Sequence, residues 1–593
     1  MLQELARYAE KQRLPGLPGY KTKPVKWVVV LTEDGQYVDT MELEQNQFYH
    51  CPDLAQNQLG PGKLSRSHFL VASTSVVTLF GAKSEEVEKH ACFVELLHKA
   101  AADCLPLELC ARLLENEDVT KQINTTLETR KAKPTHYITF QVGQRLALEM
   151  PEWRSWWQVF RSRPAASNPD TSRMICLLTG EVVTPALTHN LKVSLPKSVG
   201  GLSMGSVLIG FDKEAFRSYG LVQSANAACV EEAAATYATA LNDLIRQAPP
   251  PLGGALMLHW YSEKIPDEDD LFPDMMSFGD ESNAASARNK ARELLTAVRA
   301  GKRPELTQNR YFVLQVSGSG GRVMVRDWFT GDFVRLVESV NAWYDALEII
   351  KPHGGEIAEP PKLARLLIRL VSYRPGEEAK DLFKRINTQL APFLPKLWRA
   401  ILQGGPLPDT TAQFALAHAR SRLLREDDEQ ATGNLDWIAC AILKAWLVRQ
   451  ARLNAQEQND MEAKVNKDHP ATAYHIGRVV AVFAKLQRDA LPDVGAGVVQ
   501  RYFASASTTP ALVLYRLVRN AQYHLDKLDN KGLIIWYERQ IAEIMTRLGD
   551  AVPSTLDLEG QTLFTLGYYQ QQAEMYSGAK SDKDSTQANE GGK

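Results

Sequence analysis

The spacing of hydrophobic residues predicts two kinds of structure along this chain, with a change near residue 350. Before it, short apolar runs bounded by turn residues predict strands, and apolar positions three and four residues apart predict helices. The predicted strands cover residues 27–31, 37–43, 68–79, 136–142, 206–211, 256–261, 311–316 and 322–328. The predicted helices cover residues 1–14, 85–103, 105–115, 151–160, 231–246, 284–300 and 333–349. This half of the chain is therefore expected to be mixed α/β.

Beyond residue 361 the strand pattern disappears. Helical spacing continues over 362–372, 377–394, 396–403, 412–426, 435–463, 471–490, 510–527, 533–548 and 556–576, and short connections favour antiparallel bundles. The predicted fold class is α+β, a mixed α/β N-terminal region with an all-α helical-bundle C-terminal domain. We expect a DNA-engaging region at 1–250, its α/β continuation at 251–355, a helical region at 361–460, a bundle at 461–576 and a disordered tail at 577–593.

Composition narrows the possible functions. A chain of 593 residues is longer than a single hydrophobic core usually accommodates, so more than one domain is expected. Its formal net charge of −2 means that any nucleic-acid contact is a local basic patch or is shared with partner subunits. Seven scattered cysteines without a Cys-x-x-Cys pair support neither a zinc ribbon nor a disulfide framework, so no metal is predicted. With no apolar run of about 18 residues and no signal-peptide core, we expect a cytoplasmic protein without a membrane span.

The stretch from Cys176 to Asn242 contains the densest candidate chemistry. A Cys-x-x-Thr-Gly turn precedes a loop rich in Lys and Gly, and an apolar helix follows. Glycines allow close backbone approach to a ligand, and exposed N–H groups beside lysines suit phosphate oxygens. The candidate DNA-binding residues here are Lys192, Lys197, Gly200, Gly201, Ser203, Gly205, Ser206, Gln223 and Asn226. Tight turns alone would equally explain the glycines, and a hydrogen-bonded structural role is the preferred interpretation of His189.

The order of residues in this stretch resembles that of a known family. Cys-x-x-Thr-Gly is followed by His189, Gly200-Gly201, Ala215-Phe216, Ser218-Tyr219-Gly220, Asn226, Tyr237 and Ala240-Leu241-Asn242. This sequence is similar to the large subunit of the type I-C CRISPR Cascade surveillance complex. Residues 311–347, 478–491, 501–527 and 566–571 extend the resemblance over most of the chain.

The resemblance implies a non-catalytic subunit without a cofactor. Such a subunit recognises the PAM, the short motif that flanks the target in double-stranded DNA, supports R-loop formation and recruits a separate helicase-nuclease. The implied partners are the crRNA-containing Cascade subunits, the target duplex and the displaced single strand.

Further basic residues are candidates for contacts with nucleic acid. Lys63 and Arg66 lie in the short basic loop GPGKLSRS. By the resemblance, the C-terminal bundle would line the path of target and displaced strands, with Arg478, Lys485, Arg488, Arg516 and Arg519 as candidates. A solvated helix face is the ordinary explanation of such charges. Trp153, Trp156 and Trp157 share a helical face that predicts a domain core more readily than a base-stacking platform.

The sequence offers little support for an enzyme. The sequence has no phosphate loop of the Gly-x4-Gly-Lys type and no His-Glu-x-x-His helix. Residues 201–205 fit Gly-x-Ser-x-Gly, with Ser203 in the place of an esterase nucleophile, but that motif requires a strand before the serine and a helix after it. The alternatives to a Cascade subunit are a helical scaffold without nucleic-acid contact and a serine esterase using Ser203.

Met461 is a candidate internal start of translation. It lies in a polar gap between two helical blocks, and the chain after it is near the size of one domain. In the family that this chain resembles, the same region is also made as a separate small subunit. The codons of Gln456-Glu457 can be CAG-GAG, which contains the ribosome-binding core AGGAG three codons before Met461. Met461 would otherwise be an ordinary linker residue.

Overall fold

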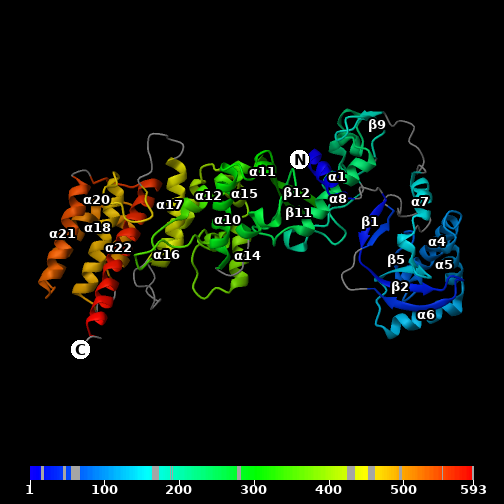
Figure 1. Ribbon diagram of the computed structural model, residues 1–593, viewed down its shortest axis with the longest axis horizontal. Helices are drawn as coiled ribbons and strands as arrows, with labels where there is room; N and C mark the ends of the chain where they lie inside the picture. The colour runs from blue at the N-terminus through cyan, green and yellow to red at the C-terminus, as the bar shows by residue number, and fades with distance from the viewer. Residues whose placement is uncertain are drawn as a thin grey trace. The chain divides into compact units, whose positions relative to one another are not determined.

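A computed structural model describes residues 1–14, 19–43, 49–54, 67–162, 173–186, 188–189, 191–276, 282–423, 435–451, 461–492, 497–549 and 552–590 (Figure 1). The chain groups into two compact units. Unit 1 comprises Met1–Leu195, Gly201–Arg246 and Gly320–Val323, and unit 2 comprises Pro196–Gly200, Gln247–Ser319 and Met324–Lys593. Strands and helices mix in the N-terminal region and helices follow toward the C-terminus, which confirms the predicted fold class.

A mixed sheet forms the N-terminal core of unit 1. Its strand order is β3-β2-β6-β5, and β7 pairs with β6. The strands are β2 (Val25–Leu31), β3 (Tyr37–Glu42), β5 (Ala72–Ser73), β6 (Tyr137–Val142) and β7 (Arg145–Leu146). β2 runs parallel to β6 and antiparallel to β3. The helices here are α3 (Thr74–Val77), α4 (Ser84–Ala100), α5 (Pro106–Glu115) and α6 (Glu117–Thr129). Buried residues of these strands and helices form one hydrophobic core.

The tryptophan-rich helix α7 (Glu152–Ser162) packs into the same core. Trp153 and Trp157 are buried, and the Trp157 ring stacks on Phe69 with centroids 5.4 Å apart. The indole of Trp157 donates to the carbonyl of Gly19 at 3.0 Å, just before β1 (Tyr20–Lys23), which pairs with β4 (Tyr49–Pro52). The core role expected for these two tryptophans is confirmed.

The remainder of unit 1 is built around helix α8 (Glu231–Gln247). The hydroxyl of Tyr8, in helix α1 (Leu2–Lys11), donates to Asp243 of α8 at 2.8 Å. Arg161 at the end of α7 forms an ion pair of 2.6 Å with Glu231 at the start of α8. The short hairpin of β8 (Met174–Ile175) and β9 (Val182–Val183) completes this part.

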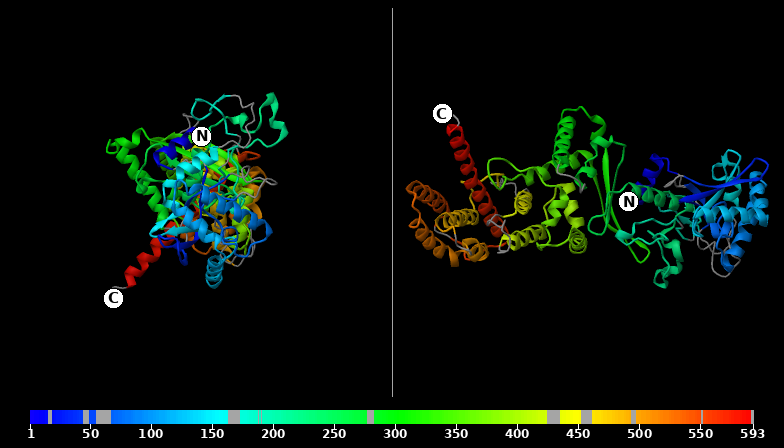
Figure 2. Two further views of the ribbon diagram at one scale, coloured as in Figure 1. Left: turned by 90° about the vertical axis from the view of Figure 1, so that its right-hand side faces the viewer. Right: turned by 90° about the horizontal axis from the view of Figure 1, so that it is seen from below.

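Unit 2 begins with an antiparallel sheet of strand order β10-β11-β12 (Figures 1 and 2). The strands are β10 (Leu256–Tyr261), β11 (Arg310–Ser319) and β12 (Arg322–Asp332). Between β10 and β11 the chain forms α9 (Phe272–Met276), α10 (Ser282–Arg299) and α11 (Pro304–Thr307). After β12 it forms α12 (Phe333–Leu347), α13 (Leu363–Ile368), α14 (Ala379–Gln389) and α15 (Leu394–Gln403), and all seven helices contribute to one core.

The C-terminal helices continue that core. They are α16 (Asp409–Leu423), α17 (Trp437–Ala451), α18 (Thr472–Ala490), α19 (Val498–Ala506), α20 (Pro510–Leu525), α21 (Lys531–Leu548) and α22 (Leu558–Glu590). Helices α18 and α22 lie side by side at very short range (Figure 1). A Cβ atom on Gly477 would lie 2.0 Å from the carbonyl oxygen of Phe564, and one on Gly567 would lie 2.1 Å from that of Tyr474. The two backbones are thus in contact because each helix has a glycine at the crossing.

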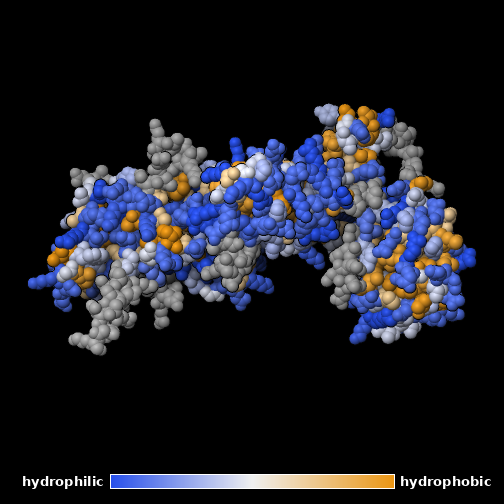
Figure 3. All heavy atoms as spheres, viewed as in Figure 1, coloured by the Kyte–Doolittle hydropathy of each residue, from blue (hydrophilic) through white to orange (hydrophobic). Residues whose placement is uncertain are grey.

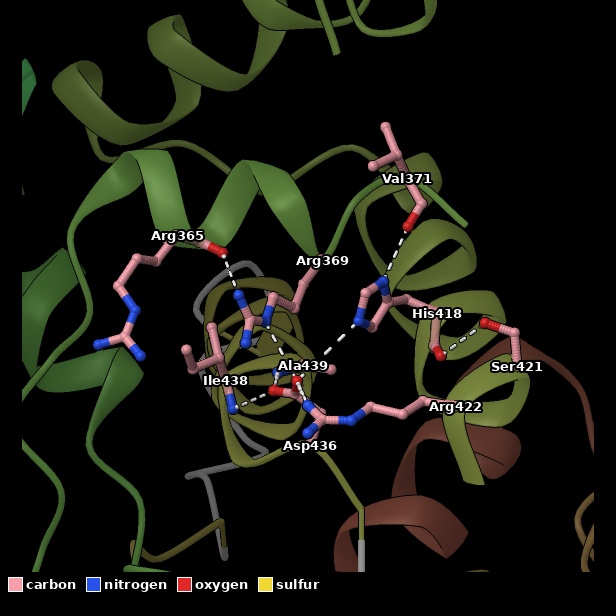
Figure 4. A network of polar contacts seen from close by, with 9 residues as sticks. All are labelled: Arg365, Arg369, Val371, His418, Ser421, Arg422, Asp436, Ile438 and Ala439. Atoms are coloured by element: carbon pink, nitrogen blue, oxygen red, sulfur yellow. Dashed lines mark hydrogen bonds and ion pairs between the residues drawn. The ribbon is translucent and has the colours of Figure 1, made fainter. Parts of the chain in front are cut away.

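A buried carboxylate fixes the start of α17 (Figure 4). Asp436 accepts hydrogen bonds from the backbone N–H groups of Ile438 at 2.9 Å and Ala439 at 3.2 Å, so it acts as the N-cap. The guanidiniums of Arg369, which follows α13, and Arg422, in α16, both bind its second oxygen. The side chain of Asp436 is 1% exposed, so this anion joins three helices inside the core.

Two predicted strands are absent. The run 68–79 contains only the short strand β5, and the chain then turns into helix α3. The run 206–211 forms only isolated bridges, Val193 with Ser206 and Val207 with Arg322. Apolar content alone does not distinguish a buried strand from irregular buried backbone. Helices α6 and α19 lie outside the predicted helices, and α22 extends past residue 577, the predicted start of a disordered tail. The five proposed segments remain predictions.

Candidate nucleic-acid interface

Helix α8 holds the segment 176–242 in place through polar side chains. Tyr237 donates its hydroxyl hydrogen bond to Nδ1 of His189 at 2.7 Å, and Nε2 of His189 donates to the carbonyl of Ala227 at 3.2 Å. Burial lowers the pKa of His189, which keeps the ring neutral. The structural role preferred for His189 agrees with this geometry.

Asn242 of α8 fixes the start of the Lys- and Gly-rich loop. Its side-chain oxygen accepts from the N–H of Ser194 at 2.8 Å, and its nitrogen donates to the carbonyl of Lys192 at 3.1 Å. Val193 and Ser206 then exchange two backbone hydrogen bonds of 2.8 Å. The family-like residues Tyr237 and Asn242 therefore act as supports for the loops that precede them.

The glycines of the loop face the protein's own backbone. A Cβ atom on Gly201 would lie 1.9 Å from the carbonyl oxygen of Leu195, and one on Gly200 would lie 2.3 Å from that of Gly318. Gly205 has a φ of +80° and lies against the side chain of Lys192. Internal packing accounts for all three glycines, so a bulky replacement would disturb the loop whether or not DNA binds there.

Ser203 does not lie in a nucleophile elbow. It is exposed in a turn, preceded by the 3-10 turn η2 (Lys197–Val199) and followed by irregular chain. Both ring nitrogens of His189 are already engaged. Ser206 is 0% exposed, and its hydroxyl has no hydrogen-bond partner among the described residues. The geometry around Ser203 thus lacks the strand–turn–helix arrangement on which the esterase alternative depends.

Beside the loop, unit 1 contains a cavity of about 390 Å³. Its lining includes Lys192, Gln223, Asp212 and Arg322. The side-chain oxygen of Gln223 is buried and has no hydrogen-bond partner in the described part of the chain. Arg322 donates to the carbonyl of Gly210 at 2.9 Å and forms an ion pair with Asp212. The structure therefore brings together Lys192 and Gln223, two of the predicted residues, at a cavity that Val207, Ile209 and Phe211 also line.

Residues 212–222 form a projecting loop, here called the finger. The side chain of Asn226 donates to the carbonyls of Phe216 at 2.8 Å and Gln223 at 3.0 Å. This predicted DNA-binding residue therefore holds the base of the finger. Lys213, Arg217 and Tyr219 are exposed on the finger, although none of them was among the candidates. Lys213 and Arg217 lie in an irregular loop that has no periodic signal, whereas Tyr219 belongs to the family-like run Ser218-Tyr219-Gly220, which was an available signal.

The Cys-x-x-Thr-Gly turn connects β8 to β9. Gly180 donates to the carbonyl of Cys176 at 2.9 Å, and Ile175, Leu177 and Val182 on this hairpin are each more than half exposed. Figure 3 shows apolar atoms gathered at the hairpin surface. Burial opposes ionisation of Cys176, but hydrogen bonds from Thr179 and nearby backbone lower its pKa to about 7.

The basic candidates of the bundle separate into two groups. Arg478 was predicted to line the strand path, but it is 0% exposed and binds Gln571 at 2.9 Å and Glu543 at 3.1 Å. Because a guanidinium enclosed in the core cannot reach a strand at the surface, its role is structural. Lys485 forms a 2.7 Å ion pair with Asp489, and Arg488 lies over the ring of Tyr576.

Helix α20 presents a basic and aromatic face, here called the α20 face. Leu512, Tyr515, Arg516, Arg519 and Tyr523 are exposed at helical spacing, with Tyr515 78% and Tyr523 56% exposed. Arg516 and Arg519 form no ion pair with any residue that the structure describes. Exposed cations interleaved with aromatic rings suit single-stranded nucleic acid.

The other candidates are placed as follows. Lys197 is exposed and belongs, with Gly200, to unit 2. Lys63 and Arg66 lie outside the described residues. Among the described residues, no group of three or more His, Cys, Asp or Glu side chains could hold a metal ion. No helix in the same part of the chain is long and apolar enough to cross a membrane.

Comparison with known proteins identifies the family. A search of curated proteins found no match. The family model described as CRISPR-associated protein (Cas_Csd1) matches residues 2–576, nearly the whole chain. The match covers both the loops on α8 and the C-terminal bundle with the α20 face. The chain therefore belongs to the CRISPR-associated Cas_Csd1 family and is a Cascade-type protein.

Proposed function

We propose that this protein is the non-catalytic large subunit of a type I-C Cascade complex. In that role it recognises the PAM in double-stranded DNA, supports R-loop formation and recruits a separate helicase-nuclease, while the guide RNA reads the target by base pairing. The observation that carries the proposal is the family match over residues 2–576. crRNA-containing Cascade subunits would be its partners.

The geometry supports placing the duplex contact in unit 1. Lys192 lines the cavity of unit 1 together with Gln223, whose buried oxygen lacks a partner among the described residues. Exposed Lys213 and Arg217 lie on the neighbouring finger. Phosphates bound by these cations would fix the position of the duplex, and a buried amide oxygen is the kind of group that accepts from a base edge.

In the same proposal the α20 face contributes to the path of a single strand. Arg516 and Arg519 supply charge for the backbone, and Tyr515 and Tyr523 supply rings on which bases stack. The finding that Arg478 is buried removes it from this path.

The duplex contact is tested by titrating the assembled complex with target duplex at several salt concentrations. Lys192→Gln and Lys213→Gln should each weaken binding and reduce the salt slope by roughly one counterion per lost phosphate contact. Glutamine removes the charge but keeps a flexible polar side chain, slightly shorter than that of lysine, and the exposed Lys121 provides a matched control, Lys121→Gln. Affinity and salt slope that match the wild type in both variants would refute the assignment of these lysines.

The scaffold alternative is tested in the same preparation. A subunit of an RNA-guided complex should copurify with a guide-sized RNA and with other Cascade subunits, whereas a scaffold without nucleic-acid contact should not. Absence of RNA from a preparation that retains those subunits would favour the scaffold.

A further inference from the structure

The finger exposes an aromatic ring that has no contact surface on its own chain. Every residue from Asp212 to Gly220 is exposed, and Tyr219 is 100% exposed. Large aromatic side chains usually bury most of their area in a fold, so a fully exposed ring in a defined loop calls for an explanation.

The backbone holds Tyr219 in an unfavourable conformation. Its φ of 58° and ψ of 23° place it in the left-handed region, which non-glycine residues seldom adopt. Such a backbone conformation is unfavourable in free energy and persists only where the surrounding structure enforces it, which is most often at functional sites. The ring is therefore held out from the loop.

Contacts at the base of the finger supply that constraint. Asn226 binds the carbonyls of Phe216 and Gln223, and Arg322 binds the carbonyl of Gly210 and the carboxylate of Asp212. The ring of Phe216 packs edge-on against Phe211 with centroids 5.4 Å apart. Both ends of the finger and its middle residue, Phe216, are thus anchored, whereas the side chains of Lys213, Arg217 and Tyr219 make no such contact in the described structure.

The charges on the finger favour an anionic ligand. Lys213 and Arg217 are exposed on either side of Glu214, and within the described residues neither forms an ion pair. Asp212 is neutralised by Arg322. An exposed ring on the same loop as exposed cations is the combination with which proteins bind unpaired nucleotides, because bases stack on the ring and phosphates bind the cations.

We propose that Tyr219 stacks on an unpaired base where the target duplex opens, and that Lys213 and Arg217 bind the adjoining phosphates. This inference rests on the proposed function, since it requires that the complex opens DNA. It assigns the position of the opened base pair to the finger. The ring substitutes for the neighbouring base that is lost from the stack when the duplex separates.

The test uses the assembled complex and three kinds of DNA. The first is a duplex that contains only the flanking motif, which is selected from a randomised library by binding to the wild-type complex. The second is the same duplex with a target that matches the guide. The third is a set of matched duplexes, each with one abasic nucleotide near the flanking motif. Tyr219→Ala removes the ring and Tyr219→Phe retains it. Because Tyr219 is fully exposed, both variants should melt at the wild-type temperature and retain all subunits.

The expected results separate stacking from docking. Tyr219→Ala should weaken binding to the matched duplex by roughly tenfold, the loss of one base–ring stack, while Tyr219→Phe stays close to the wild type. Binding to the flank-only duplex should be equal in all three proteins. At one abasic position the wild type should fall to the level of Tyr219→Ala, with no further loss in the variant, as the coupling of two contacting groups requires.

Three outcomes would overturn the inference. The first is wild-type affinity of Tyr219→Ala for matched duplex, and the second is additive loss at every abasic position. The third is loss of a Cascade subunit from the Tyr219→Ala complex, which would identify the ring as a protein contact. If the wild-type complex itself binds neither duplex, the proposed function fails instead.

Discussion

Asp436 is the residue at which charge contributes most directly to the fold. Burial acts to raise its pKa, but Arg369 and Arg422, with further help from His418 and the capped N–H groups, hold the pKa below its ordinary value. The His418 ring donates from Nδ1 to the carbonyl of Val371 at 2.8 Å (Figure 4). This hydrogen bond, and not one to Asp436, sets the orientation of the ring. Asp436 is therefore ionised in the native protein at neutral pH.

Replacement of this carboxylate should destabilise unit 2 in a pH-dependent way. Asp436→Asn keeps a side chain that caps helices well but leaves two guanidiniums unpaired, at a cost of about 2–4 kcal/mol, less than for a fully enclosed pair because Arg422 is 42% exposed. A lowered folded-state pKa gives stabilisation that is complete above the unfolded-state pKa of about 4 and is lost as the pH falls through the folded value.

Urea unfolding of wild type and Asp436→Asn at several pH values measures this. The difference in the free energy of unfolding should be largest near neutrality and shrink as the solution becomes more acid than about pH 4. Asp436→Ala also loses the helix cap, so its free energy of unfolding should be lower than that of the asparagine variant at every pH. A difference that is constant with pH would show that the charge does not act as described.

At this scale the sequence predicted some roles and missed others. Trp153, Trp157 and His189 were predicted to be structural, because helical spacing and the rarity of a lone functional histidine both point that way. Arg478 was assigned to a surface because its partners Gln571 and Glu543 lie 93 and 65 residues further along the chain. No local pattern reveals that such distant groups enclose a charge.

Among the helices, α20 and α18 should respond differently to loss of arginine. Arg516→Ala with Arg519→Ala should leave the melting temperature unchanged, since both side chains are exposed, and should reduce binding of single-stranded DNA and its salt slope. Arg478→Ala should instead destabilise the protein by about 2–4 kcal/mol, less than for a fully enclosed ion pair because the remaining carboxylate, Glu543, is 32% exposed.

Thermal melting and salt-dependent strand binding, measured on the same assembled complexes, distinguish the two effects. An α20 double variant that binds strands as the wild type does would remove the α20 face from the proposed path. An Arg478 variant of unchanged stability would contradict the structural role of that residue.

Elements were predictable where periodicity was strong. Helices α1, α8 and α12 follow their apolar spacing closely, because one face of each is buried, and α18 also matches its predicted range although it is buried on all sides from Ala473 to Ala484. The run 68–79 was misassigned because its apolar residues form two clusters on either side of Ser73-Thr74-Ser75, without a period that distinguishes strand from helix. Helix α6 had an available signal, the capping residue Asn116 followed by acidic residues, which the apolar pattern alone does not weigh.

For the whole molecule, the proposed internal start at Met461 can be examined against its surroundings. Met461 is 7% exposed and belongs to the core of unit 2. The carbonyl of Glu462 accepts from Gln570 at 2.8 Å, a contact that a fragment would keep, whereas Ala463 and Tyr569 both bind Ile350, which it would lack. A separate small subunit would therefore have one face that requires a new neighbour.

Intact-mass analysis of the purified complex checks this proposal. A fragment that begins at or near Met461 should copurify from the native gene, and it should disappear when Met461→Leu is combined with synonymous recoding of Gln456-Glu457. The full-length protein with the same change provides the control, since leucine preserves an apolar side chain of similar volume. If no such fragment accompanies the native gene product, Met461 is an ordinary linker residue.

The close crossing of α18 and α22 has a consequence for genetics. A single methyl group at Gly477 or Gly567 would collide with a backbone carbonyl that has no room to move, and overpacking of this kind costs about 1–3 kcal/mol or more. Alanine at either codon should thus behave as a conditional allele, with defence retained in the cold and lost on warming. Both codons follow Met461, so one mutation would strike the full-length chain and any shorter product together.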